Sequence, residues 1–248
     1  MPAGSGPPPV EYTVRIDADG LLEINRLRVA GSLVSNAVHE INNALQAVGG
    51  NAELLGLKPE IGPAEQRRLQ AIVTQSGRVS ATLDRLASFT RATDRGRQPV
   101  DLAELAETAL ALRAFRLNRA HIVATVERAG SVPCIAVIDR TRILQVLLNL
   151  LLNAETALAN LAAPAIHIRV ERDHESCRVL FTDNGAGISA EGRAQLAGAA
   201  GIQRLGAGLS GLGLWASARI AAQHGGRLAV AGTSPASASL ELTLPAVR

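Results

Sequence analysis

Two runs of apolar residues at helical spacing, separated by a short break rich in glycine and proline, constrain the N-terminal part of this 248-residue chain. The first run contains Ala30, Val34, Ala37, Ile41, Ala44, Val48 and Leu55, and the second contains Leu69, Ile72, Ser76, Val79, Leu83 and Leu86. Because the break at residues 56–63 is short, the two helices are predicted to fold back as an antiparallel hairpin. Each apolar seam is too narrow to form a core alone, so the hairpin is expected to pair with a second copy in a four-helix bundle.

Alternating helical and strand patterns follow the hairpin, which predicts an α+β fold whose second part is a two-layer α/β sandwich. Helices are predicted at residues 102–112, 142–161 and 214–224, and strands at 122–127, 135–138, 166–171, 178–182, 227–231 and 239–244. The predicted division is a flexible N-terminal segment at 1–26, the hairpin at 27–91, a linker at 92–99 and the sandwich at 100–248. Residues 11–25 fit a short strand pair or the remnant of an input segment, and the Ala/Gly-rich residues 196–209 are predicted to form a mobile loop.

Composition and charge exclude several classes of protein. The net charge of +3 is small and aromatic residues make up only 2% of the chain, so few rings are present on which bases could stack, and nucleic-acid binding is disfavoured. No apolar run approaches the roughly 20 residues of a membrane span, and residues 1–9 lack the pattern of a secretion signal, which predicts a cytoplasmic protein. Cys134 and Cys177 fit no metal-binding spacing and are predicted to be buried free thiols.

The segment His39-Glu40-Ile41-Asn42-Asn43 lies inside the first apolar run. His39 falls between two seam positions and is expected to point outward. An imidazole with an adjacent carboxylate, followed by an amide one turn later, suits the handling of a phosphoryl group. A solvated surface histidine is the more common origin of such an isolated pattern, so the interpretation depends on the motifs that follow.

Asn149 and Asn153 lie four residues apart on the predicted helix at 142–161 and therefore share one face. A buried amide without a partner costs about 1–3 kcal/mol, so two amides among apolar residues indicate a polar ligand or a metal. A capped or solvent-facing pair is the alternative.

Two glycine-containing segments come later in the chain. The sequence DNGAGI begins at Asp183, directly after a predicted strand; its glycines allow close backbone approach to a ligand, and Asp183 offers an acceptor to an amino group. A simple turn would explain this segment equally well. Residues 206–214, with the sequence GAGLSGLGL, lead into a helix, where free N–H groups and the helix dipole suit phosphate.

Together and in this order, the motifs resemble those of two-component sensor histidine kinases over about residues 27–244. HEINN is similar to the phosphoacceptor box of that family, residues 139–154 (DRTRILQVLLNLLLNA) to its asparagine box, DNGAGI to its first glycine box and GLGL to its second. The resemblance implies a HisKA-type dimerisation and phosphoacceptor hairpin, followed by a Bergerat-type ATP-binding domain.

The resemblance also implies roles for single residues. His39 would accept the phosphoryl group. Glu40 would orient and deprotonate His39, and Asn43 would align water for dephosphorylating a partner. Asn153 would bind magnesium, with Asn149 supporting the metal and the phosphates of ATP. Asp183 would hold the adenine amino group, Gly185 and Gly187 would shape that pocket, and Gly211 and Gly213 would pass beneath the phosphates.

The chain departs from the family pattern at several positions. Ala44 replaces the proline that often follows the phosphoacceptor box, and Leu209 replaces the first glycine of GxGLGL. Residues 188–208 contain neither the family's phenylalanine box nor its lid lysine, since Lys58 is the only lysine of the chain. Arg193 or Arg204 could contact phosphate instead, although a planar guanidinium is not equivalent to an ammonium group.

The implied function is that of a homodimeric kinase that phosphorylates His39 from Mg-ATP and passes the phosphoryl group to an aspartate of a response regulator, with dephosphorylation of that partner as the reverse activity. Residues before Leu21 are too few for an ordinary sensor domain, so sensing is expected to reside in a separate protein. The main alternative is a phosphorelay module with a degenerate ATP-binding domain. A relative of the same ATP-binding fold, such as a serine kinase or a conformational ATPase, is the second alternative.

Overall fold

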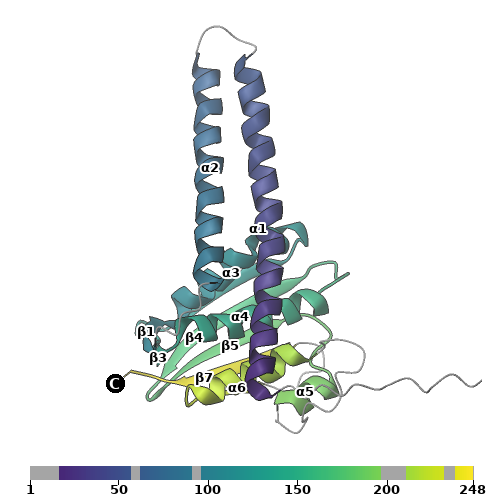
Figure 1. Ribbon diagram of the computed structural model, residues 1–248. Coiled ribbons are helices and arrows are strands. Elements are labelled where there is room, and N and C mark those ends of the chain that lie inside the picture. The colour runs from purple at the N-terminus through teal and green to yellow at the C-terminus, as the bar shows by residue number, and fades with distance from the viewer. Residues whose placement is uncertain (1–16, 57–61, 91–95, 197–210, 232–237, 248) are drawn as a thin grey trace, which may run out of the picture.

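The computed structural model describes residues 17–56, 62–90, 96–196, 211–231 and 238–247. Two long helices, α1 (Ala18–Gly56) and α2 (Pro63–Thr90), form a hairpin that stands on an α/β domain (Figure 1). The predicted combination of a helical hairpin with an α/β domain is therefore confirmed.

Helix α1 begins at Ala18, nine residues before the predicted boundary at residue 27. Asp17 caps this start, because its side chain accepts a hydrogen bond of 2.8 Å from the backbone N–H of Gly20. Leu21 and Leu22 are buried one turn later. The prediction of a short strand pair is thus wrong for residues 18–25, where a capping residue and apolar side chains at helical spacing favour a helix.

The buried face of α1 differs from the predicted seam near its N-terminal end. Val34 is 43% exposed, whereas Val29 and Leu33 are buried in the same core as the helices of the α/β domain. The physical reason is that the first third of α1 packs on the α/β domain. A pattern derived for an isolated hairpin could not include this second contact.

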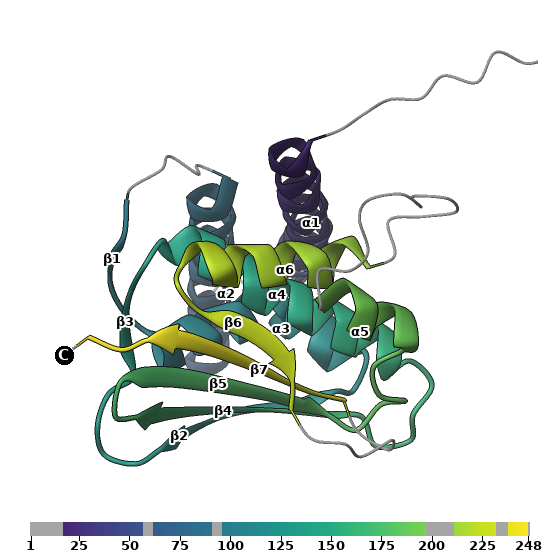
Figure 2. The same cartoon turned by 90° about the horizontal axis from the view of Figure 1, so that it is seen from below.

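The α/β domain contains a five-stranded sheet in the order β2 (Val123–Ala129), β4 (Ala165–Asp173), β5 (Ser176–Asp183), β7 (Ala238–Pro245) and β6 (Arg227–Val230). Strands β2 and β4 are parallel, and the other neighbours are antiparallel. Helices α3 (Leu102–Arg119), α4 (Arg140–Ala157) and α6 (Leu212–Gln223) cover one face of the sheet (Figure 2). The predicted two-layer sandwich is confirmed.

Three features of this domain differ from the predicted elements. Helix α3 continues to Arg119, a short strand β1 (Gln98–Asp101) pairs with β3 (Ile135–Ile138), and a short helix α5 (Ala190–Leu196) follows the DNGAGI segment. Strand β1 is held by pairing with residues far away in sequence, which local patterns do not report. Cys134 and Cys177 are buried free thiols, as predicted. Within the described part of the chain, no helix combines the length and apolar character needed to cross a membrane.

The turn between α6 and β6 depends on two successive glycines. Gly225 has a φ of 72°, and a Cβ on Gly226 would lie only 2.1 Å from the backbone oxygen of Thr243 in β7. Gly226→Ala is therefore expected to lower the free energy of unfolding by about 1–3 kcal/mol, measured by urea denaturation. Gly77→Ala is the matched control, because nothing lies within 4 Å of the added methyl group. Equal stability of the two variants would contradict this reading of the turn.

Candidate functional site

A cavity of about 220 Å³ lies between α4, the end of β5, α5 and the start of α6. Four residues singled out from the sequence line it: Asn153, Asp183, Gly187 and Gly211. Most of the remaining wall is apolar and includes Leu150, Phe181, Ile188, Leu214 and Leu240. The cavity thus has the apolar walls and few polar groups that are typical of a small-molecule site.

Asp183, the last residue of β5, supplies a buried acceptor to this cavity. Asp183 is only 6% exposed. One of its carboxylate oxygens accepts a hydrogen bond of 2.9 Å from the backbone N–H of Gly185. Burial raises the pKa of Asp183, and the hydrogen bond from Gly185 partly opposes this shift. A Cβ on Gly185 would lie 2.8 Å from that oxygen, so glycine is required for this contact.

The DNGAGI segment is not a hairpin turn, because it leads from β5 into α5 and not into a paired strand. Asn184 fixes its start. The Asn184 side chain accepts a hydrogen bond of 2.8 Å from the N–H of Ala165 and donates one of 2.8 Å to the carbonyl of Ala163. These contacts hold Asp183 at the floor of the cavity, which favours a ligand-binding interpretation over a simple turn.

Asn153 lines the cavity from α4, and its buried Nδ2 atom has no hydrogen-bond partner among the residues that the structure describes. Since the two ends of an amide are assigned from their surroundings, a free end can equally present its oxygen. A neutral amide oxygen is a suitable ligand for Mg²⁺, which binds proteins through few oxygen atoms and takes further ligands from phosphates and water. Asn153 therefore fits the predicted metal ligand.

The opposite end of the cavity is formed by the start of α6. Gly211 precedes this helix with a φ of 87°, and within the described part of the chain no side chain caps the free N–H groups of its first turn. Such a helix start suits an anion. Arg193, on α5, is exposed and donates its Nε–H to the carbonyl of Ile188 at 3.3 Å. Arg204 and most of the predicted loop at 196–209 lie outside the described residues.

Asn149 does not line the cavity. It is fully buried and exchanges hydrogen bonds with Asn25 of α1, at 3.1 Å in one direction and 2.9 Å in the other. Its oxygen also accepts from Arg28 at 3.0 Å, and its Nδ2 lies 3.3 Å from the hydroxyl of Ser217. The predicted contact of Asn149 with a nucleotide would require these bonds to be exchanged, so that role stays a prediction.

Asn25 and Arg28 were missed by the sequence analysis, although both belong to this part of the molecule. Asn25 has no exposed surface, and its oxygen also accepts a hydrogen bond of 2.7 Å from Gln145. The available signal was its position, since Asn25 precedes Val29 by four residues on the buried face of α1. A polar residue at an apolar position of a helix indicates a buried polar partner.

The phosphoacceptor motif lies on α1, away from the cavity. The backbone of His39 and Glu40 is helical, but their side chains are outside the described part of the structure. Asn43, one turn further, is exposed. Along a continuous helix, the eleven residues from Arg28 to His39 span roughly 16 Å. The cavity and the histidine are therefore separate in this arrangement.

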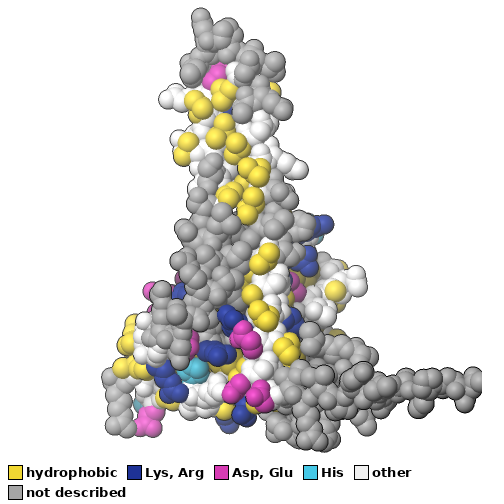
Figure 3. Space-filling view, in the orientation of Figure 1, with side chains coloured by type: hydrophobic (Ala, Val, Ile, Leu, Met, Phe, Trp, Pro, Cys, Tyr) yellow, Lys and Arg dark blue, Asp and Glu magenta, His cyan; other side chains and the backbone are white. Residues whose placement is uncertain are grey.

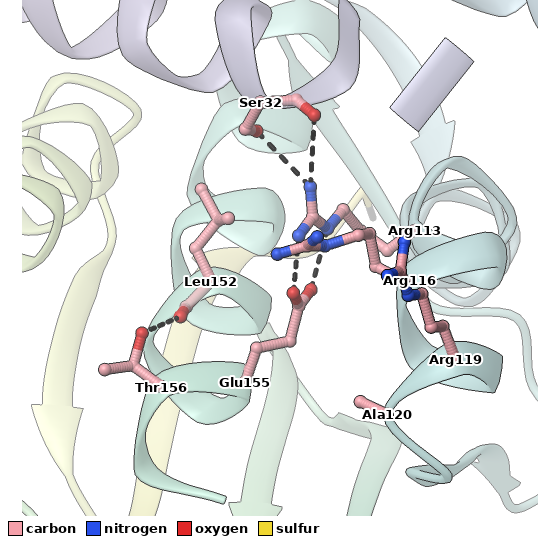
Figure 4. Close-up of a pocket in the computed structure, with 8 residues that line it drawn as sticks. All are labelled: Ser32, Arg113, Arg116, Arg119, Ala120, Leu152, Glu155 and Thr156. Atoms are coloured by element: carbon pink, nitrogen blue, oxygen red, sulfur yellow. Dashed lines mark hydrogen bonds and ion pairs between the residues drawn. The ribbon is translucent and has the colours of Figure 1, made fainter. Parts of the chain in front are cut away.

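A second cavity, of about 560 Å³, lies where α1 meets α3 and α4 (Figure 4). Arg113 of α3 is 2% exposed and forms a two-pronged ion pair with Glu155 of α4, with 2.7 Å between Nε and one carboxylate oxygen. The same guanidinium donates to the backbone carbonyl and the hydroxyl of Ser32 on α1, at 3.5 and 3.4 Å. Figure 4 shows the guanidinium of Arg113 between Ser32 of α1 and Glu155 of α4. This cluster fixes α1 to the α/β domain.

Comparison with known families adds to this geometry. Residues 138–248 match the model of the histidine kinase-, DNA gyrase B- and HSP90-like ATPases. The sensor histidine kinase ZraS of Escherichia coli is 27% identical over 227 residues, which are 92% of this chain and 48% of that protein. The C4-dicarboxylate transport sensor protein DctB of Rhizobium meliloti is 29% identical over 214 residues, which are 85% of this chain and 34% of DctB. The chain thus spans half or less of the length of these relatives.

Solved structures share the fold. The catalytic domain of the histidine kinase ThkA matches with a TM-score of 0.53 and 24% identity, over 61% of this chain and 99% of that domain. Full-length ShkA, solved with AMPPNP, matches with a TM-score of 0.52 and 23% identity, over 88% of this chain and 46% of ShkA.

Proposed function

Since this chain is a relative of sensor histidine kinases, with a histidine kinase-, DNA gyrase B- and HSP90-like ATPase domain at residues 138–248, we propose that it transfers the γ-phosphoryl group of Mg-ATP to His39. The observation that carries this proposal is the cavity beside α4. Asp183 provides one buried acceptor at its floor. Asn153 lines the cavity with an amide nitrogen that has no partner among the described residues, and the start of α6 contributes N–H groups that no described side chain caps. This is the distribution of polar groups that an adenine nucleotide requires.

The residues would act through position and charge. Asp183 would accept a hydrogen bond from the adenine amino group, and Asn153 would bind the magnesium ion that neutralises the phosphate chain. Gly211 and Gly213 would let the backbone approach the phosphates. Phosphoryl transfer depends mainly on such positioning and on charge neutralisation. Glu40 would orient His39 and act as the base that takes a proton from it, because the imidazole nitrogen is nucleophilic only when it carries no proton.

Transfer requires a change in this arrangement, because the part of α1 that contacts the α/β domain at Arg28 lies about three helical turns before His39. Either the α/β domain moves along α1, or it reaches His39 of a second copy. The contacts of Asn25, Arg28 and Ser32 with the domain would break during the first of these movements. The structure accordingly resembles a state before transfer.

A second copy of the chain is the proposed partner of the hairpin. Figure 3 shows hydrophobic side chains along the surface of the hairpin. The large apolar side chains exposed on its two helices include Leu45 at 59%, Leu54 at 45%, Leu69 at 41% and Val73 at 65%. Exposed apolar side chains of this number are usually covered by a partner. Pairing of two hairpins in a four-helix bundle would bury them.

The proposed acceptor of the phosphoryl group is an aspartate on the receiver domain of a response regulator. A phosphoryl group on imidazole is a suitable donor to a carboxylate, and exposed Asn43, one turn after His39, is suited to align water for the reverse dephosphorylation. A separate sensor protein would supply the stimulus.

The test is incubation of the purified protein with γ-labelled ATP and magnesium. Acid-labile, base-stable label on the protein is the expected result, because phosphohistidine has this stability. Label that resists acid would contradict the proposal and indicate a serine or threonine kinase. Absence of label, despite a folded protein, would favour the phosphorelay module.

A further inference from the structure

Arg28 of α1 lies against Gly213 at the start of α6, two residues after Gly211, which lines the cavity; Arg28 itself is not one of the described residues that line it. Its Nη2 donates a hydrogen bond of 3.0 Å to Asn149, and a Cβ on Gly213 would lie only 2.7 Å from the same nitrogen. Gly213 therefore leaves the space that the guanidinium occupies. The side chain reaches this point from the hairpin, across the contact between the two parts of the molecule.

The guanidinium of Arg28 has no negatively charged partner among the residues that the structure describes. Its Nε is buried and makes no hydrogen bond there, and burial lowers the pKa of the group. Arg26, two residues earlier, contrasts with it, because it pairs with Glu23 on the exposed side of α1. A partly buried cation without a counter-charge is costly, so an anion is expected at this point.

The start of α6 makes the same demand. Among the described residues no side chain caps the N–H groups of its first turn, and this end of the helix dipole is positive, which repels Arg28 unless an anion lies between them. A phosphate group carries only acceptors, and it would satisfy the guanidinium and these N–H groups together.

We propose that Arg28 is a nucleotide-binding residue, whose guanidinium binds the phosphate chain of ATP or ADP beside the first turn of α6. This inference rests on the proposed function and extends it, because it assigns to phosphate a cation from outside the ATP-binding domain, which contains no lysine: the only lysine, Lys58, precedes that domain. The fork of an arginine can bind two phosphate oxygens at once. Because Arg28 belongs to α1, a bound nucleotide would hold the domain on the hairpin at a distance from His39.

The proposal is tested by isothermal titration of Mg-ATP, Mg-ADP and adenosine into wild type, Arg28→Gln, Arg28→Lys and the control Arg26→Gln. Loss of one charge-assisted contact to phosphate predicts that Arg28→Gln binds ATP and ADP at least about tenfold more weakly, with adenosine binding within about twofold of wild type. Arg28→Lys should recover part of the affinity. Arg26→Gln should bind like wild type.

Three results would overturn the assignment. Unchanged ATP affinity in Arg28→Gln would show that Arg28 does not touch the phosphates. Stronger ATP binding in that variant would show that Arg28 blocks the site and leaves it on binding. If Arg28→Gln fails to fold, the Arg28→Lys variant provides the test. Wild-type affinity of Arg28→Lys for ATP and ADP would refute a phosphate contact that depends on the planar guanidinium. Absence of nucleotide binding to the wild type would instead refute the proposed function, and this inference with it.

Discussion

Replacement of His39 by glutamine is expected to abolish the acid-labile label that the wild-type protein acquires from γ-labelled ATP. Glutamine keeps a polar side chain of similar length but has no nucleophilic ring nitrogen, so no phosphoryl-nitrogen bond can form. ATP affinity should stay within about twofold of wild type, because His39 lies roughly 16 Å along α1 from the arginine beside the cavity. Measuring label and affinity on the same preparation separates loss of the acceptor from loss of the nucleotide.

His174→Gln is the matched control for this experiment. His174 is exposed in the turn between β4 and β5, so its replacement should leave labelling at the wild-type level. Label that persists on His39→Gln and disappears from His174→Gln would place the acceptor in the turn between β4 and β5 and contradict the assignment of His39. Persistent label on both would point to an acceptor that neither motif nor geometry indicates.

Asp183→Asn is expected to weaken ATP binding about 10- to 100-fold, because an amide offers adenine a poorer, uncharged acceptor than a carboxylate. The same change should leave the fold intact or make it more stable. Asparagine can still accept the hydrogen bond from Gly185, and it removes a charge that is costly to bury at 6% exposure. Thermal unfolding and titration with ATP on the same variant test both parts.

The pKa of Asp183 gives this prediction a dependence on pH. Burial raises that pKa, so the folded protein holds the proton to a higher pH than the unfolded chain does. The contribution of Asp183 to the free energy of unfolding is therefore greatest below the ordinary pKa of an aspartate. It decreases as the pH rises through the raised pKa of Asp183 in the folded protein. The stability gain of Asp183→Asn should be present at neutral pH and should vanish in acid. ATP binding by wild type should weaken as the pH falls and the carboxylate is protonated.

Asp173→Asn serves as the control, because Asp173 lies at the opposite end of the paired strands β4 and β5 and forms an ion pair with Arg178. It should bind ATP like wild type. An Asp183→Asn variant that binds ATP with wild-type affinity would remove Asp183 from the adenine site. A variant that loses both affinity and folded structure would show that the carboxylate is structural.

The hairpin and the two-layer sandwich were predictable, because their signals are local. Apolar residues at a spacing of three and four mark the helices, and alternation marks most strands of the sheet. The position of Asp183 could also be predicted, since a carboxylate directly after a strand, followed by glycines, lies at the edge of a sheet with an open approach. Strand β1 could not, because it exists only through its pairing with β3.

The hydrogen-bond partners of Asn149 could not be predicted from local sequence patterns. Its burial followed from the apolar residues around it on α4. The sequence pattern suggested a polar ligand or a metal beside it, whereas Asn25 and Arg28, more than 120 residues earlier, occupy its amide in this arrangement. The carboxylate of Asp183 accepts a hydrogen bond only from the nearby Gly185 among the described residues, and its contact with a nucleotide stays a prediction.

By itself the sequence determined most of the helices and strands and which side chains carry acid, amide and imidazole chemistry, because these depend on neighbours within a few positions. Tertiary structure alone decided that the first turns of α1 pack on the α/β domain and bring Arg28 to the start of α6. That contact joins residues 28 and 213 through the burial of Val29 and Leu33 in a shared core. The free energy of such a contact depends on shape and charge across two separate elements, which no periodicity in either one contains.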